Sequence, residues 1–236
     1  MSKPVLVGDV GGTKIRLALA SSSLGHVQLH NIKVYDDPTI PSFEDAIEDY
    51  LSSSDVKPKS ALFALAGPIA DDGSIKLTNR TWPRVVPSVI QSRFLIDSAT
   101  IVNDFAAMAR AIPEIPNDSF ETVIESHFSP EGPILVTGPG TGHGVSTLIQ
   151  SVTGGWRVMT GEGGHSAFAP RNMREAAIRD VIARTYNYVS VEMIVSGRWL
   201  MPVYEAICEL EGVTPEDLSP QNILDRADAG DKVCVE

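Results

Sequence analysis

Two apolar, β-branched stretches of this chain each break at a glycine-rich turn and then resume. The segments are residues 5–10, 11–13 and 15–19 in the first case, and residues 134–137, 138–144 and 145–151 in the second. β-branched residues favour strands, and a tight glycine turn between two such runs is typical of a hairpin. The repetition predicts two domains that each open with a strand, a turn and a strand, as expected from duplication of one fold rather than a solenoid.

Other segments alternate between strand and helix patterns. Apolar spacing predicts a helix from Phe43 to about Ser53 behind Ser42 as its N-cap, and other helices over residues 88–94 and from Phe105. Strands are expected over 27–35, 61–66, 74–77 and 100–102. Residues 113–133 are rich in Pro, Ser, Asn and Asp, which predicts a crossing between domains at 1–112 and 113–236. Helical patterns dominate from Met173 onward, with Asn172 as a cap.

Charge and cysteine content narrow the class of protein. The formal net charge is -11 over 236 residues, so neither nucleic acid nor an anionic membrane surface is an expected partner. Cys208 and Cys234 have no C-x-x-C spacing, which argues against a disulfide framework and a zinc site. The N-terminal apolar stretch is too short for a signal peptide, and no window approaches membrane-span length, so the expected location is cytoplasmic.

The first glycine turn has features of an anion site. Gly11 and Gly12 lack side chains, so backbone N–H groups can approach an anion, and Thr13 adds a hydroxyl donor beside Asp9. No Lys-Ser or Lys-Thr follows as in a Walker A loop, and a strand rather than a helix comes next, unlike a dinucleotide fingerprint. A plain glycine hairpin remains the alternative.

The second turn, residues 138–144, has glycine at every other position, beginning with Gly138 and Gly140. Thr141 follows Gly140 inside the turn. Such spacing frees N–H groups to point at phosphate oxygens. Taken alone, this loop is as compatible with a simple connection as with a phosphate site. Two such turns together would clamp a polyphosphate from both sides.

Asn103 and Asp104 lie where a strand ends and a helix begins, the region where α/β folds commonly meet ligands. Two interpretations stay open. Asp104 is a good helix cap. Alternatively, Asp104 accepts a hydroxyl proton while Asn103 hydrogen-bonds the substrate.

Acidic and imidazole side chains mark two further segments. Glu162 and His165 are three apart in a Gly-Glu-Gly-Gly-His segment, without the additional ligands that a metal site needs. Sugar hydroxyls, which donate and accept, suit this pair better, although a structural turn is an alternative. Glu192 lies in an apolar stretch and is explained by an exposed helix face or by projection toward a polar ligand.

Taken in order, these motifs resemble the bacterial glucokinase family, specifically its zinc-free group within the actin-like and hexokinase superfamily. The segments that carry the resemblance are Asp9 to Thr13, Thr78-Asn79 with Trp82, Asn103 to Phe105, residues 138–142 and residues 161–165. The Cys-rich zinc motif of the related repressor and kinase group is absent from the sequence. The resemblance implies an α/β fold of two ribonuclease-H-like domains around a cleft, the second incomplete, with glucose at the hinge.

The resemblance also implies roles for individual residues. Asp104 would be the general base, and the sugar ligands would be Asn103, Glu162, His165 and Glu192. Asp9 would lie near the Mg²⁺ that accompanies ATP, through water. Phosphates would be held by Gly11, Gly12, Thr13, Gly138, Gly140 and Thr141. The implied reaction is ATP-dependent phosphorylation of glucose at its 6-hydroxyl, the first step of glycolysis, by a homodimer.

Two departures from the family pattern qualify this expectation. Lys14 stands where the zinc-free group more often has Asn. The chain ends at Glu236, before the adenosine-binding segment and final helix of the family, so we expect a shortened chain that binds ATP weakly. A catalytically inactive sugar-binding or regulatory module is therefore an alternative, and an ATPase of the actin and chaperone type is another.

Overall fold

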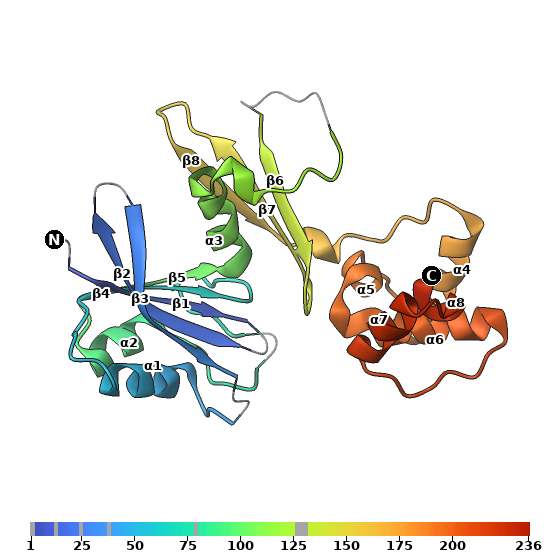
Figure 1. Ribbon diagram of the computed structural model, residues 1–236, viewed down its shortest axis with the longest axis horizontal. Helices are drawn as coiled ribbons and strands as arrows, with labels where there is room; N and C mark the ends of the chain where they lie inside the picture. The colour runs from blue at the N-terminus through green and yellow to red at the C-terminus, as the bar shows by residue number, and fades with distance from the viewer. Residues whose placement is uncertain (1–2, 12–13, 24–25, 37–38, 78–79, 126–131) are drawn as a thin grey trace. The chain divides into compact units, whose positions relative to one another are not determined.

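The structure, a computed structural model, describes residues 3–11, 14–23, 26–36, 39–77, 80–125 and 132–236. Residue contacts divide the chain into unit 1, Met1–Phe128, and unit 2, Ser129–Glu236. Unit 1 runs from blue to green in Figure 1, and unit 2 from yellow-green to red. Sheets and helices occur in both, which confirms the predicted α/β class. The domain limits at 1–112 and 113–236 stay a prediction.

Unit 1 is built on a five-stranded mixed sheet in the order β3-β2-β1-β4-β5. The strands are β1 Val5–Val10, β2 Ile15–Ser23, β3 His26–Tyr35, β4 Ser60–Leu65 and β5 Ser98–Asn103. β1 pairs antiparallel with β2, and β2 with β3, whereas β4 runs parallel to β1 and β5 parallel to β4. The register aligns Val10 with Leu65 and Leu65 with Asn103, so the carboxyl ends of three strands share one edge.

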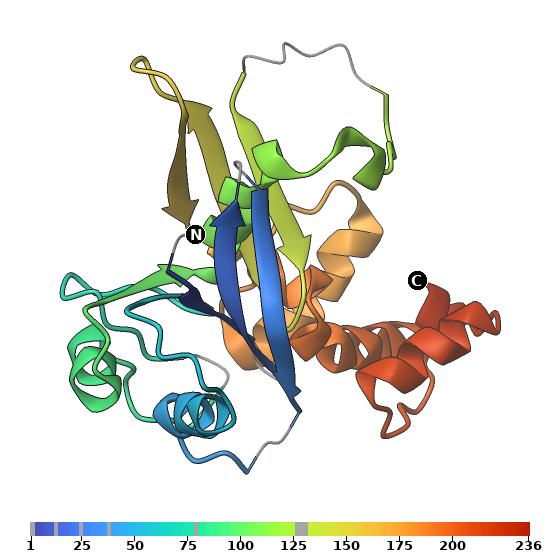
Figure 2. The same ribbon diagram turned by 60° about the vertical axis from the view of Figure 1, so that its left-hand side comes forward.

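Helices cover both faces of this sheet. α1 Phe43–Ser52 and α2 Pro87–Phe94 lie on one face, and α3 Asp104–Ala111 on the other (Figures 1 and 2). α1 starts where predicted because Ser42 Oγ accepts the N–H of Asp45 at 3.1 Å. Short 3₁₀ turns, η1 Ile112–Glu114 and η2 Asn117–Ser119, follow α3.

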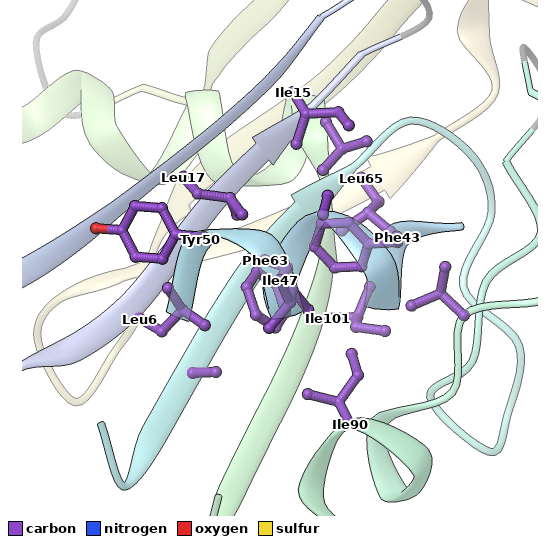
Figure 3. Packing of buried hydrophobic residues seen from close by; sticks show 14 of the residues in the cluster. Leu6, Ile15, Leu17, Phe43, Ile47, Tyr50, Phe63, Leu65, Ile90 and Ile101 are labelled. Carbon is purple, nitrogen blue, oxygen red and sulfur yellow. The ribbon is translucent and has the colours of Figure 1, made fainter. Parts of the chain in front are cut away.

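The core of unit 1 lies between the sheet and α1 with α2 (Figure 3). Phe43 of α1 meets Phe63 of β4 edge to face, with ring centroids 4.9 Å apart. Leu6, Phe63 and Ile90 are fully buried and come from β1, β4 and α2. Close packing of this kind fixes the strands, and therefore the edge where they end.

The predicted hairpin after Asp72 is only partly present. Gly73 has a φ of 76°, and Asp72 Oδ1 accepts the N–H of Ser74 at 2.9 Å, so the turn is there. The predicted strand over 74–77 is wrong, because Ile75 makes isolated bridges to Ile69 and Val85, two different segments. Single bridges to separate partners do not build a ladder.

Unit 2 begins with an antiparallel three-stranded sheet in the order β6-β7-β8, formed by β6 Ile134–Pro139, β7 His143–Gln150 and β8 Trp156–Gly161. The sequence predicted the first two strands but not β8. The predicted turn over 138–144 is too long, because Gly138 pairs with Gly144 and Pro139 with His143. Only residues 140–142 connect these strands, and Gly138 lies within β6.

Helices dominate from Met173 onward, as predicted. The elements after β8 are η3 Gly163–His165, α4 Met173–Tyr186, α5 Glu192–Val195, η4 Gly197–Trp199, α6 Leu200–Glu211, α7 Pro220–Asp228 and α8 Lys232–Val235. Asn172 caps α4 by accepting the N–H of Glu175 at 2.8 Å. Ile182 and Ala206 bury the contact between α4 and α6, and a second cluster joins Tyr204 to Ile223 of α7. Within the described ranges, no helix is long and apolar enough to cross a membrane.

Candidate active site

The carboxyl edge of the unit 1 sheet carries the candidate base. Asn103, the last residue of β5, is the N-cap of α3, because its Oδ1 accepts the N–H of Ala106 at 3.1 Å. Its amide Nδ2 donates to Gly67 O at 3.2 Å and to Asp104 Oδ1 at 3.0 Å. Of the two interpretations left open by the sequence, the cap belongs to Asn103, and the carboxylate of Asp104 is held beside it.

Asp104 has an unusual environment for a carboxylate. Burial raises the pKa of Asp104 above its ordinary value, and the negative charge of Asp9 raises it further. The N–H of Phe105, 2.9 Å from Asp104 Oδ1, opposes this rise in pKa by stabilising the anion. A carboxylate of raised pKa is a stronger base, which suits proton transfer near neutral pH.

The first glycine turn is closed by its own backbone. Gly11 donates its N–H to Lys14 O at 3.0 Å, which gives the bend of the β1–β2 hairpin. Gly12 and Thr13, both predicted phosphate ligands, lie outside the described residues, as do Thr78 and Asn79. Asp9 is half exposed, and its Oδ2 lies 2.6 Å from Nη1 of Arg16, its cross-strand neighbour.

Arg80 is a residue to which the sequence assigned no role. Its guanidinium stacks on Trp82, 4.3 Å from the ring centroid, and its Nε lies 3.4 Å from Gly11 O. Burial lowers the pKa of Arg80, and no carboxylate in the described part of the chain lies within ion-pair distance. This cation adds positive charge beside the first turn. Arg80 lies between Asn79 and Trp82, in a segment that carries the family resemblance. This position is the sequence signal by which it could have been found.

The second glycine turn is tied to a later segment of unit 2. Gly140 N–H donates to Gly142 O at 2.7 Å, so this N–H is used within the turn. Gly140 O accepts from Gly197 N–H at 2.8 Å, and Thr141 O accepts from Arg198 N–H at 3.3 Å. The turn is therefore held against η4 rather than standing free.

Glu192, the first residue of α5, is half-buried and turns its carboxylate toward this turn. Oε2 accepts the N–H of His143 at 2.8 Å. An added Cβ on Gly142 would lie 2.8 Å from the same oxygen. The interpretation of Glu192 as a residue on an exposed helix face is therefore wrong. In this structure its carboxylate accepts a hydrogen bond from a backbone N–H.

Glu162 is the N-cap of η3 and His165 is its last residue, and their side chains lie together. His165 Nε2 is 3.6 Å from Glu162 Oε2, and both side chains are largely exposed. Tyr188 donates its hydroxyl to His165 O at 2.6 Å. Gly164 between them packs directly on the start of β7, since an added Cβ would lie 2.2 Å from His143 O. The pair is therefore presented from a fixed backbone.

The predicted site residues fall into two groups. Unit 1 brings together Asp9, Asn103 and Asp104 at one sheet edge, and unit 2 brings Glu192 to the second turn, with η3 packed beside it on β7. Among the described side chains, no group of three or more His, Cys, Asp or Glu could hold a metal ion by itself. The unit 1 group offers two carboxylates and an amide, and the unit 2 residues offer two carboxylates and an imidazole. These are donors and acceptors that polyhydroxyl ligands need.

Comparison with known proteins gives consistent matches over nearly the whole chain. A family model described as Glucokinase matches residues 6–236. The glucokinase of Nitrobacter hamburgensis is 35% identical over 233 residues, which cover 98% of this chain and 71% of that protein. A crystal structure of a glucokinase from an Antarctic psychrotroph superimposes with a TM-score of 0.80 at 29% identity, covering 100% of this chain and 74% of that one.

A second solved structure, glucokinase from Balamuthia mandrillaris in complex with glucose, has a TM-score of 0.77 at 26% identity. The match covers 98% of this chain and 70% of that one. These likenesses confirm the resemblance and the fold class predicted from the motifs.

Proposed function

This chain belongs to the glucokinase family, and we propose that it transfers the γ-phosphoryl group of ATP to the 6-hydroxyl of glucose. The observation that carries the proposal is the environment of Asp104. Its carboxylate lies at the carboxyl edge of parallel strands, is freed from capping by Asn103, and has a raised pKa. A general base for a sugar hydroxyl needs this combination of place and basicity.

In the proposed reaction the 6-oxygen of glucose attacks the γ-phosphorus as the bond from that phosphorus to the bridging oxygen of ADP breaks. The hydroxyl proton passes to Asp104, and ADP and glucose 6-phosphate are the products. Phosphoryl transfer has a loose transition state, so positioning and charge neutralisation provide most of the acceleration. We assign sugar contacts to Asn103, Glu162, His165 and Glu192.

Phosphate contacts are assigned to the two turns, through Gly11, Gly12, Thr13, Gly138, Gly140 and Thr141. The N–H groups of Gly11 and Gly140 donate within their own turns in this structure, so both would have to exchange these bonds for bonds to phosphate oxygens. Mg²⁺ would supply charge neutralisation on the phosphates. Asp9 fits a contact to it through water, because Arg16 pairs with only one carboxylate oxygen, Oδ2, and Mg²⁺ usually keeps several waters. We further propose that the protein works in the cytoplasm as a homodimer and catalyses the first step of glycolysis. Neither nucleic acid nor a membrane is proposed as a partner.

A coupled assay of glucose 6-phosphate formation tests the proposal directly. We expect MgATP-dependent turnover, and Asp104→Asn should lower kcat by at least about a hundredfold, the usual contribution of a positioned base. Glucose should still bind this variant, as measured by calorimetry, because the amide preserves shape and hydrogen bonding.

Asp97→Asn is the matched control. Asp97 directly precedes the first residue of β5, at the end of the strand away from Asp104. Its side chain is exposed and pairs with Lys59 at 3.8 Å, so this variant should keep full turnover. Near-wild-type turnover of Asp104→Asn would reduce Asp104 to a structural residue. Glucose binding by the wild-type chain without any turnover would instead support the inactive sugar-binding module.

A further inference from the structure

We propose that Glu192 is a positioning residue for the nucleotide as well as a sugar ligand: its carboxylate holds the turn at residues 140–142 in place. The inference rests on the proposed function for the identity of the two ligands. The geometry itself is independent of that identity, because it consists of contacts inside unit 2.

Three hydrogen bonds join the segment 192–198 to the turn and the residue after it. Glu192 Oε2 accepts from His143 N–H at 2.8 Å. Gly197 N–H donates to Gly140 O at 2.8 Å, and Arg198 N–H donates to Thr141 O at 3.3 Å. Of these, only the first involves a side chain and a charge, and charge-assisted bonds are roughly twice as strong as neutral ones. Glu192 is therefore the member of this set whose removal loosens the turn most.

The turn also packs closely against this segment. An added Cβ would lie 2.8 Å from Glu192 Oε2 at Gly142 and 3.2 Å from Gly140 O at Gly197. Backbone and carboxylate thus touch on both sides of the interface. Residues 140–142 therefore cannot move toward α5 and η4 unless these elements move too, and a movement away from them breaks the three hydrogen bonds.

The two oxygens of the Glu192 carboxylate are assigned different contacts, one with the turn and one with the sugar. Oε2 is taken by His143 N–H, and in the described residues no hydrogen bond is made to Oε1. A sugar hydroxyl that donates to Oε1 would orient the same carboxylate that holds the turn. Sugar binding should therefore raise nucleotide affinity, with a coupling of about fivefold or more, the lower end of typical values.

The test uses the full chain and compares Glu192→Ala and Glu192→Gln with Glu162→Ala. Glu162 is the matched control, because it is also a proposed sugar ligand but its side chain pairs with His165, which lies outside the turn. Calorimetry measures two dissociation constants. One is the Kd of the non-hydrolysable nucleotide AMPPNP, in the presence of Mg²⁺ and without sugar, and the other is the Kd of glucose without nucleotide. Hydrogen exchange measures the backbone amides of residues 137–146.

Glu192→Ala should weaken AMPPNP binding about tenfold or more and speed exchange at His143 by a similar factor, as expected for loss of a bond to a charged group. Glu192→Gln, which keeps an acceptor, should restore part of both. Glu162→Ala should weaken glucose alone.

Wild-type AMPPNP affinity together with unchanged exchange in Glu192→Ala would overturn the inference, even in a chain that phosphorylates glucose. Faster exchange throughout unit 2, uncorrected by Glu192→Gln, would also overturn it, because Glu192 would then stabilise the unit as a whole. Failure of the proposed function looks different: no turnover by the wild type, with the local exchange effect at His143 still present.

Discussion

Asn103 and Asp104 divide two tasks that a single residue often performs at a helix start. Asn103 caps α3 and also holds the neighbouring carboxylate, so Asp104 is free for chemistry but is partly withdrawn from water. Desolvation of a charged group costs stability. The residue proposed as the base is thus expected to destabilise the fold that presents it.

Asp104→Asn should therefore increase the free energy of unfolding at neutral pH. The folded state binds the Asp104 proton at pH values where the unfolded chain has released it, because the pKa is raised in the folded state. The contribution of Asp104 to stability consequently falls as pH rises from the ordinary value of 3.8 through the raised value. Urea unfolding of both proteins between pH 4 and 8 should show a higher free energy of unfolding for the variant. This difference should grow as pH rises and then level off.

Asp45 supplies a control of opposite sign. Hydrogen bonds from Ser42 and Arg93 lower the pKa of Asp45, so its charged form stabilises the fold above the ordinary pKa and this stabilisation is lost as pH falls through the lowered one. Asp45→Asn should therefore reduce stability at neutral pH. An equal loss in Asp104→Asn would contradict the assigned cost of its burial.

Sequence brought together those candidate residues that are neighbours in the chain, and missed the contacts that depend on strand register or on residues distant in sequence. Asn103 next to Asp104, and Glu162 near His165, were recognisable from short motifs. The pairing of Asp9 with Arg16 depends on the β1–β2 register, and the approach of Arg80 to Gly11 joins residues distant in sequence. Glu192 was found, but its contact with His143 spans 49 positions and no local pattern encodes it.

At the scale of elements, the ends of helices and strands were less predictable than their existence. The second turn is shorter than its glycines suggested, because β6 and β7 continue their pairing through Gly138 and Gly144. Glycine is a weak strand former, and here pairing with the neighbouring strand outweighs that preference. β8 was missed because Trp156–Gly161 is mostly exposed and has no clear apolar alternation.

The end of α2 offers a prediction about backbone strain. Leu95, its C-cap, has a φ of 55°, a left-handed conformation that costs side chains with a Cβ, and 76% of the residue is exposed. Leu95→Gly should raise the free energy of unfolding by up to about 1 kcal/mol, since little apolar burial is lost.

Leu95→Ala is the control for this effect. Alanine keeps the Cβ that strains the backbone and so should give no gain in urea unfolding. A gain with alanine equal to that with glycine would attribute the effect to the exposed apolar side chain instead of φ.

At the scale of the whole molecule, each unit has its own hydrophobic core. The cluster around Phe43 and Phe63 belongs to unit 1, whereas the clusters around Ile182 and Tyr204 belong to unit 2. Separate cores permit separate local unfolding. The two strand, turn and strand openings predicted from sequence thus correspond to the starts of the two sheets.

Phe63→Ala should lower the stability of unit 1 by about 3–5 kcal/mol, the usual cost of removing a fully buried aromatic ring. Native-state hydrogen exchange should place this loss in peptides from residues 3–125 and leave α4 and α6 of unit 2 protected. Equal loss in both units would show that the chain unfolds as a single cooperative body. Ile182→Ala is the reciprocal control for unit 2.

Gly164 has a consequence for how related sequences are recognised. A side chain there would place Cβ 2.2 Å from His143 O, whereas a Cβ on Gly161, three positions earlier, would meet nothing within 4 Å. The Gly-Glu-Gly-Gly-His string therefore mixes an obligatory glycine with an exchangeable one. A search profile built on this geometry would demand glycine at 164 and admit alanine or serine at 161.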